Sequence, residues 1–527
     1  MRVAAYLRVA GKKAKLLSMS AAQKLDRFGI AAALQEIARL MEMKGGQSRF
    51  KAKAYNAGAR AIQGVANLER LIEEDNLTSI PRIGSALASQ IKQLYLTGES
   101  SVLNELRMQF PKGPAKKKKL AALHLHHALS AAEQAIEYLK TIEGVEDVSI
   151  AGSLRRWEET VGTVDLVASA KDPAAVVEQF QRFPSIESSQ ADGPNSCVAQ
   201  LVDGAQVSLT VVPPKEFPLA VFVKTGSESH VARVTELAAK KKVSLARTPR
   251  SEEQIYSRLK MAYVPPELRE DQGEIEAALA DKLPDDLVTE AHIKGMVHCH
   301  TTYSDGIHSL EAMVRGAEEM GMKYITITDH SPTASYAGGL KVDKLRQQWD
   351  EIDELQGNVK IKILRGTESD IIANGGLDYP DDILEQFDVI VASIHARYKM
   401  DGPKMTERIT KAMRHHVFKI WGHGLGRLLQ RRPPFDCDVE RILDVIAESR
   451  AAIEINGDPY RLDLEPRWVR EARKRKIKFV ISTDAHSVKA MTNLKYGVAM
   501  ARRGWVTQKE VLNTLPTVAF TRAVKPL

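Results

Sequence analysis

Nine residues of types that bind divalent metal ions recur along the C-terminal part of this 527-residue chain. They are His298, His300, Asp305, His330, Glu368, His395, His423, Asp484 and His486. His298 and His300 lie two positions apart, so in a strand both rings would point to one side while Cys299 points away. Imidazoles clustered with carboxylates suit Zn²⁺ or Mn²⁺, and Fe²⁺ is a further candidate. Because nine ligands exceed what one ion needs, we expect two or three divalent metal ions.

Such a cluster is suited to the hydrolysis of phosphate esters, because closely spaced cations activate water and neutralise charge on the phosphate oxygens. A cationic side chain is also needed to hold the phosphate. We assign this catalytic role to Arg427, in GHGLGRLL, and Arg397, in HARYK. The alternative for both arginines is an ion pair at the surface. The residue types and their spacing therefore predict a metal-dependent phosphoester hydrolase.

Short apolar strands that alternate with helical stretches must position these residues. From Lys294 onward we expect strands at 295–298, 324–328, 360–366, 389–394, 420–423, 452–455 and 478–482. Seven strands in this rhythm predict a distorted (β/α)7 barrel, whose catalytic residues should follow the strands at the C-terminal rim. Ligand-type residues follow six of the seven expected strands.

The chain divides by pattern into several domains. We interpret residues 1–19 as a flexible N-terminal extension, with Met19 as an alternative start to Met1. Apolar residues at helical spacing predict a small α-helical domain over 20–110, and PKGPAKKKK predicts a basic linker over 111–119. Helices and strands then predict an α/β domain over 120–265, followed by an acidic connector over 266–290 and the hydrolase domain over 291–527.

The composition favours a polyanionic partner, because the formal net charge is +8 and lysines and arginines cluster before residue 120. Three cysteines are too few for a disulfide framework, which indicates a reducing compartment such as the cytoplasm. No apolar run approaches the roughly 20 residues that cross a bilayer, so we expect no membrane association. His124, His126 and His127 resemble a metal motif, but helical spacing should scatter them, and we expect surface histidines.

The strings HCHTTYSDG, TDHS, GTESDI, SIHA, GHGLGRLL and STDAH resemble a PHP (polymerase and histidinol phosphatase) domain. They are most similar to the version fused to bacterial family X DNA polymerases. The resemblance implies three metal positions that share ligands. The first would use His298, His300, Glu368 and Asp484; the second Glu368, His395 and His423; the third Asp305, His330 and His486. One departure is Gly424, where relatives usually have Pro.

Residues 31–98 resemble the DNA-end-binding domain of the same family, through KGGQSRFKAKAYNAGARAI and SIPRIGSALASQIKQL. The second string is similar to a helix-hairpin-helix, whose turn offers backbone N–H groups to a DNA phosphate. This implies DNA contacts at Arg82, Gly84 and Lys92, with Arg82 in place of the first glycine of the turn. Gln90 stands where lyase-competent relatives have a lysine, and without an amine no Schiff base forms.

The string AGSLRRWEETVGTVDLV resembles a nucleotidyltransferase signature, which implies phosphate contacts at Gly152, Ser153 and Arg155. The alternative is that these residues persist because the fold needs them. Family polymerases hold two Mg²⁺ with three carboxylates, and the matching positions are Thr163, Asp165 and Ser208. One carboxylate cannot hold two Mg²⁺ against a triphosphate. The lysine linker also replaces the fingers segment, so we expect a degenerate polymerase palm and thumb.

Three functions follow from these expectations. The favoured one is a hydrolase that acts on DNA in repair, as a 3′-5′ exonuclease, a 3′-phosphatase or an abasic-site endonuclease, with the upstream half as a DNA-holding scaffold. The second is a small-molecule phosphatase of the histidinol-phosphatase type. The third is a non-catalytic module that binds DNA ends. A weak residual DNA polymerase is a further alternative.

Overall fold

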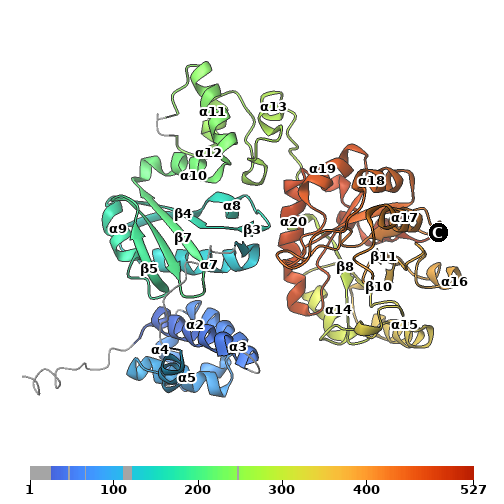
Figure 1. Ribbon diagram of the computed structural model, residues 1–527, viewed down its shortest axis with the longest axis horizontal. Coiled ribbons are helices and arrows are strands. Elements are labelled where there is room, and N and C mark those ends of the chain that lie inside the picture. The colour runs from blue at the N-terminus through green and yellow to red at the C-terminus, as the bar shows by residue number, and fades with distance from the viewer. Residues whose placement is uncertain (1–24, 45–47, 66, 111–121, 246–248) are drawn as a thin grey trace, which may run out of the picture.

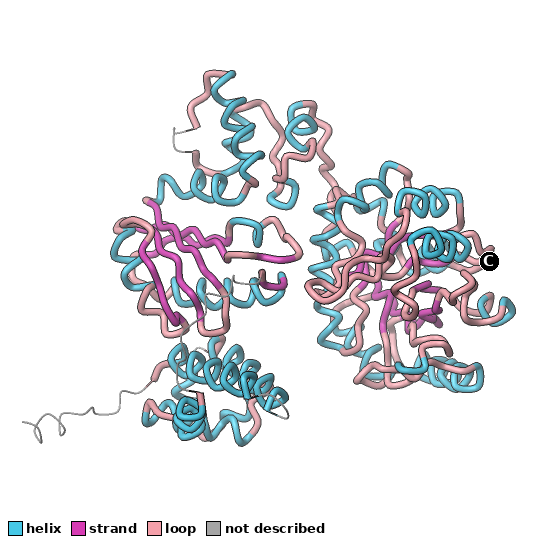
Figure 2. The backbone as a smooth tube through the Cα atoms, in the orientation of Figure 1, coloured by secondary structure: helices cyan, strands magenta, loops and turns pink. Residues whose placement is uncertain are grey.

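The computed structural model describes residues 25–527 except 45–47, 66, 111–121 and 246–248. The expected extension over 1–19 and the linker over 111–119 lie outside the described residues. The described chain forms a helical domain, a mixed sheet with flanking helices, and a barrel, as shown in Figure 1. Figure 2 shows the strands in two main groups, one in the mixed sheet and one in the barrel.

The N-terminal domain is a bundle of short helices: α2 (Arg27–Lys44), α3 (Ser48–Gln63), α4 (Leu68–Glu73), α5 (Ser85–Thr97) and α6 (Ser101–Gln109). Apolar residues at helical spacing on α2, among them Ile30, Leu34 and Ile37, are fully buried in its core. The turn before α5 forms with Arg82 at φ +74°, a left-handed backbone that favours glycine. The helix-hairpin-helix turn therefore persists without its first glycine.

The middle of the chain holds a five-stranded sheet in the order β2-β4-β7-β6-β5. The strands are β2 (Val145–Ile150), β4 (Val164–Ala170), β5 (Ile186–Ala191), β6 (Ser196–Leu201) and β7 (Gln206–Val212). Only the β4–β7 pair is parallel. Alternate residues of β4 face opposite sides, so Leu166 joins the core with α7 (Leu125–Leu139) and α9 (Pro173–Phe180), whereas Val167 packs toward α10 (Phe217–Thr225).

A small helical unit follows the sheet, made of α11 (Glu228–Lys240), α12 (Glu252–Arg258) and α13 (Glu274–Leu279). Segment 266–290, expected as a connector, adds Ile275 and Leu287 to the apolar core of this unit. Its Arg269 is fully buried and donates to the Glu252 carboxylate, which also accepts from Arg155. The segment therefore packs into the core of this helical unit.

The C-terminal domain is a barrel of seven parallel strands in sequence order, which confirms the predicted architecture. The strands are β8 (Gly295–Cys299), β9 (Tyr324–Ile327), β10 (Lys362–Asp370), β11 (Val389–Ser393), β12 (Lys419–Trp421), β13 (Ala451–Asn456) and β14 (Phe479–Ser482). The first and last strands meet through a bridge between Cys299 and Ala485. Seven strands thus nearly close the barrel.

Helices connect and cover the barrel strands: α14 (Leu310–Glu319), α15 (Val342–Gln356), α16 (Asp381–Leu384), α17 (Gly402–Met413), α18 (Val439–Glu448), α19 (Pro466–Lys474) and α20 (Leu494–Arg503). The last helix, α21 (Thr517–Val524), places Phe520 in the apolar core inside the barrel. The ring of Phe520 stacks on that of Tyr324, with 4.6 Å between the ring centroids. All three cysteines are unpaired. None of the described helices has the length and apolar character needed to cross a bilayer.

A charged contact joins the sheet domain to the barrel. Glu159, in the middle of the nucleotidyltransferase-like string, accepts from Arg503 at 2.7 Å and lies 3.4 Å from Arg427. We call these three residues the Glu159 clamp. Figure 1 shows the loop between α8 (Gly152–Arg155) and β3 (Thr160–Val161) directed at α20. The side chains of Glu159, Arg427 and Arg503 are mostly buried, so this contact lies within the boundary between the two domains.

Candidate metal centre

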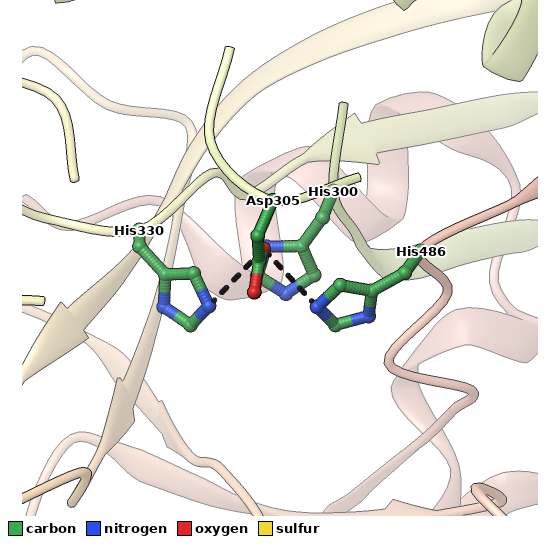
Figure 3. Close-up of side chains that lie close together, drawn as sticks. All are labelled: His300, Asp305, His330 and His486. Carbon is green, nitrogen blue, oxygen red and sulfur yellow. Dashed lines mark ion pairs between the residues drawn. The ribbon is translucent and has the colours of Figure 1, made fainter. Parts of the chain in front are cut away.

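The nine ligand-type residues converge at the C-terminal ends of the barrel strands. His298 and Glu368 lie within β8 and β10, whereas the other seven follow a strand closely. Parallel strands bring all their carboxyl ends to one rim, which explains why residues far apart in the chain meet here. Figure 3 shows four of them, His300, Asp305, His330 and His486, gathered around the Asp305 carboxylate.

Two carboxylates organise the cluster at its edge and its centre. Asp305 lies 3.2 Å from His486 and 3.5 Å from His330. Glu368 lies deeper and faces five of the histidines, with oxygen-to-nitrogen distances from 2.9 to 3.5 Å: His298, His300, His330, His395 and His423. Glu368 can therefore bridge neighbouring cations.

Asp484 completes the deep part of the cluster. It lies 3.2 Å from His300 and 3.5 Å from His298. The structure thus brings together the residues of all three expected ligand sets, with two differences in grouping. His300 also lies with the Asp305 set, and His330 also lies beside Glu368 and His395.

Electrostatics in this buried cluster favour ionised carboxylates. Burial would raise the pKa of Glu368, but the surrounding imidazoles of His395, His298 and His330 outweigh it and hold that pKa well below its usual value. The pKa of Asp484 is likewise held well below its usual value, despite burial, by His298 and His300. Burial, reinforced by His486 and His330, lowers the pKa of His300 to about 3, which keeps its imidazole neutral.

Several buried nitrogens of the cluster have no hydrogen-bond partner among the described residues. They include Nε2 of His298 and both ring nitrogens of His300. An unpartnered buried polar atom costs free energy, and each such site in a native protein calls for an explanation. Divalent cations would supply the missing partners. The donor set of imidazoles and carboxylates therefore fits a centre of two or three such ions.

Glu454 is a supporting residue that sequence reasoning missed. It lies within β13, fully buried, and accepts a hydrogen bond from Nδ1 of His298 at 2.5 Å. It also accepts from the hydroxyl of Ser482 and the backbone N–H of His423. The available signal was a lone carboxylate between two isoleucines in an apolar strand, where period-two alternation directs it into the barrel.

The two arginines expected to hold phosphate lie in different environments. Arg427 is buried, donates to the backbone carbonyls of Arg461 and Leu462, and pairs with Glu159 and Glu465. Arg397 is exposed. Sequence reasoning missed Arg461, whose guanidinium lies 3.1 Å from Asp484. Arg461 is therefore the arginine in contact with the ligand cluster.

The degenerate polymerase residues are also close together. Asp165 and Ser208 are direct partners across the parallel β4–β7 pair, and Thr163 immediately precedes β4. Burial raises the pKa of Asp165, and Lys224 and Arg156 only partly offset this. Gly152 has φ +62°, and a Cβ there would lie 2.1 Å from the Asp165 carboxylate. Of these three neighbouring positions, only Asp165 carries a carboxylate.

Of the remaining expected DNA and phosphate contacts, two are held by carboxylates. Arg155 donates to Glu252 and to Thr225, and Lys92 pairs with Asp75 at 2.7 Å. Gly84 directly precedes α5, and Ser153 lies in α8. Arg82 is exposed.

The expectation of surface histidines at the start of α7 is wrong for His124. Its ring is buried and lies 5.1 Å from that of Tyr460, in a barrel loop. His126 lies 5.0 Å from the same ring and 4.0 Å from His127. Packing against a distant loop, rather than helical spacing alone, brings the three rings together.

Comparisons with known proteins cover the N-terminal and C-terminal domains and, in one relative, most of the chain. A PHP domain model matches residues 297–458, and a helix-hairpin-helix domain model matches residues 26–100. The chain is 30% identical to the DNA polymerase/3′-5′ exonuclease PolX of Bacillus subtilis, over 91% of this chain and 96% of that protein. It is 27% identical to a probable phosphatase of Thermoanaerobacter sp., over 41% of this chain and 89% of that protein. A probable phosphatase of Acetivibrio thermocellus is 28% identical over 36% of this chain and 78% of that protein.

Proposed function

The chain belongs to the family of the DNA polymerase/3′-5′ exonuclease PolX, and on that premise we propose that it hydrolyses DNA from 3′ ends. It is a metal-dependent phosphoesterase of the PHP type. The observation that carries the proposal is the convergence of nine residues of metal-ligand type at the barrel mouth. The attached helix-hairpin-helix domain supports DNA as the substrate.

We propose further that the polymerase activity in the relative's name does not extend to this chain. The palm presents Thr163, Asp165 and Ser208 where two Mg²⁺ need three carboxylates. Burial also disfavours the ionised form of the one remaining carboxylate, Asp165. The former polymerase half then serves as a scaffold that holds DNA near the barrel.

The protein side chains would prepare the reaction in distinct ways. Bound divalent cations, with Mn²⁺ or Zn²⁺ preferred by this donor set, would activate water and neutralise the phosphate oxygens. Glu454 accepts the Nδ1 proton of His298, which leaves Nε2 directed at the cluster as a lone-pair donor. Asp370 likewise accepts a hydrogen bond from Nδ1 of His395, at 3.1 Å. Arg461 places a fixed positive charge beside Asp484, where it can orient a phosphate.

A second candidate is hydrolysis of a small phosphomonoester. The observation that favours it is the alignment of the barrel alone with probable phosphatases. Those alignments cover most of the relatives but only about two fifths of this chain. The upstream domains would then have no part in the reaction.

One set of assays separates these functions. Purified full-length protein with Mn²⁺ would be given 3′-recessed DNA, 3′-phosphorylated DNA, abasic-site DNA and histidinol phosphate. We expect shortening of the 3′-recessed strand, loss of this activity in Asp484→Ala, and no primer extension with deoxynucleotides. Turnover of histidinol phosphate with all DNA substrates intact would refute the proposal. Primer extension that survives Asp484→Ala would refute the loss of the polymerase.

A further inference from the structure

A second group of residues of metal-ligand type lies at the other end of the barrel strands. Asp381 begins α16 and Glu385 directly follows it, before β11, whereas His415 and His416 precede β12. Because β11 and β12 are adjacent and parallel, the segments that lead into them meet at the edge where both strands begin. Figure 1 shows α16 on the side of the barrel away from the mixed sheet. We call these four residues the basal cluster.

The side chains of the basal cluster point toward one another. Nε2 of His415 lies 3.2 Å from Oδ1 of Asp381, and Nε2 of His416 lies 3.1 Å from Oε1 of Glu385. One ligand atom each of Asp381, His415 and His416 lies within 4.8 Å of the other two. The two imidazole rings stack, with 4.6 Å between their centroids. A single ion can therefore reach both imidazoles and a carboxylate.

The backbone supports this arrangement on both sides. Asp381 and Glu385 are four residues apart on one helical turn, which directs both carboxylates to the same face. On the other side, the ammonium of the fully buried Lys419 donates to the backbone carbonyls of His415, at 2.5 Å, and of Val417, at 2.9 Å. These bonds hold the turn that carries both histidines against the start of β12. A site that is preorganised in this way loses less conformational entropy when it binds a ligand.

The carboxylates of the basal cluster have only the histidines as partners. Among the described residues, neither Asp381 nor Glu385 forms an ion pair with a lysine or an arginine. Histidine is mostly uncharged at neutral pH, because its ordinary pKa is about 6.5. The cluster therefore combines two uncompensated negative charges with two neutral nitrogen donors, a combination that suits a divalent cation.

The donor set also distinguishes among divalent cations. Imidazole nitrogens suit Zn²⁺, and a site of this kind generally binds Zn²⁺ more tightly than Mn²⁺. The backbone N–H of Val417 donates to Nδ1 of His415 at 3.4 Å, so the neutral ring carries its proton on Nε2. When Zn²⁺ binds Nε2, that proton moves to Nδ1 and this long hydrogen bond is lost. We therefore expect an exchangeable zinc ion rather than a permanently held one.

We propose that the basal cluster is a separate metal site that takes one Zn²⁺ ion through His415, His416 and Asp381, with Glu385 or water as the fourth ligand. The bound ion links the segment before β11 to the segment before β12. It stabilises the barrel from the end opposite to the nine-residue cluster and takes no part in hydrolysis. The proposal does not depend on which phosphoester the barrel hydrolyses.

Metal counting on the full-length protein tests the basal site without an activity assay. Protein stripped with EDTA would be dialysed to equilibrium against Zn²⁺ or against Mn²⁺, and the bound metal measured by inductively coupled plasma mass spectrometry. We expect the wild type to bind one more Zn²⁺ ion per chain than His416→Ala or Asp381→Asn. In Mn²⁺ all three proteins should bind the same number of ions, because the nine-residue cluster is intact in each.

Asp382→Asn is the matched control, because Asp382 lies on the same helical turn as Asp381 but is exposed and outside the cluster. This variant should bind as many Zn²⁺ ions as the wild type. Equal Zn²⁺ counts for wild type, His416→Ala and Asp381→Asn would overturn the basal site. If His416→Ala also binds fewer Mn²⁺ ions, it disturbs the fold, and the nearly isosteric Asp381→Asn decides. An unchanged Zn²⁺ count in Asp381→Asn would then refute the proposal, and the loss of one ion would support it.

Discussion

Replacement of Glu454 by glutamine should weaken metal binding although Glu454 is not among the expected ligands. One carboxylate oxygen accepts from His298 and Ser482, and the other accepts from the His423 backbone and Asn456. The side-chain oxygen of a glutamine can accept from only one of these two pairs of donors. Its NH2 group would then face the other two donors without an acceptor. Loss of such support costs about 10- to 100-fold in metal affinity, or roughly 1.4–2.7 kcal/mol.

The assay is a Mn²⁺ titration of the hydrolysis of bis(p-nitrophenyl) phosphate, a small substrate that needs no DNA-binding surface. Isothermal titration calorimetry would measure the metal affinity directly. Glu440→Gln is the matched control, because Glu440 is exposed on α18 and pairs only with Arg475 there. Half-saturation of Glu454→Gln at the same Mn²⁺ concentration as wild type would refute the reasoning.

Glu252→Gln should destabilise the protein by about 3–5 kcal/mol, because buried Arg269 loses its partner, and chemical denaturation measures this loss. Burial raises the pKa of Glu252, but Arg155 and Arg269 outweigh it and hold the pKa below its usual value of about 4.5. The stabilisation by ionised Glu252 is therefore complete above about pH 4.5 and is lost as the pH falls through the lower pKa of Glu252 in the folded protein. If the free energies of unfolding of wild type and Glu252→Gln still differ by the full amount at strongly acid pH, this account is wrong. Arg82→Gly should change the free energy of unfolding by no more than about 1 kcal/mol, because two effects oppose each other. Glycine removes the strain of the left-handed backbone in the folded state, but it also gives the unfolded chain more conformational freedom. A larger loss in thermal unfolding would show that the Arg82 side chain itself stabilises the fold. After treatment with EDTA, Mn²⁺ at 100 times its Kd should add about 2.7 kcal/mol of stability per site, seen as a rise in Tm that Asp484→Ala largely loses.

The barrel and its cluster were predictable because both depend on local rules. Apolar strands have a recognisable period, and residues that follow parallel strands must meet at one rim. Glu454 was not predictable as a support for His298, since it lies inside a strand and nothing in its own segment says which histidine it faces. Its partners come from β8, β12 and β14.

The roles of single side chains were hardest to predict where their partners lie far away in the sequence. GHGLGRLL places Arg427 beside the rim, but the structure engages it with Glu159, from another domain. The buried position of His124 was not expected because helical spacing says nothing of the distant loop in which Tyr460 contacts the rings of His124 and His126. The strand β5 carries little sequence signal, because its sequence, IESSQA, is polar and largely exposed at the edge of the sheet.

The Glu159 clamp has a consequence for how this protein can change over generations. Glu159 belongs to the loop between α8 and β3 of the sheet domain, and its carboxylate pairs with Arg427 and Arg503 at the surface of the barrel. Loss of the upstream half in one deletion would remove Glu159 and Glu270, but it would leave Arg427 paired with Glu465 of the barrel. A free-standing descendant of this barrel would therefore keep a carboxylate for Arg427, whereas Arg503 would lose both Glu159 and Glu270.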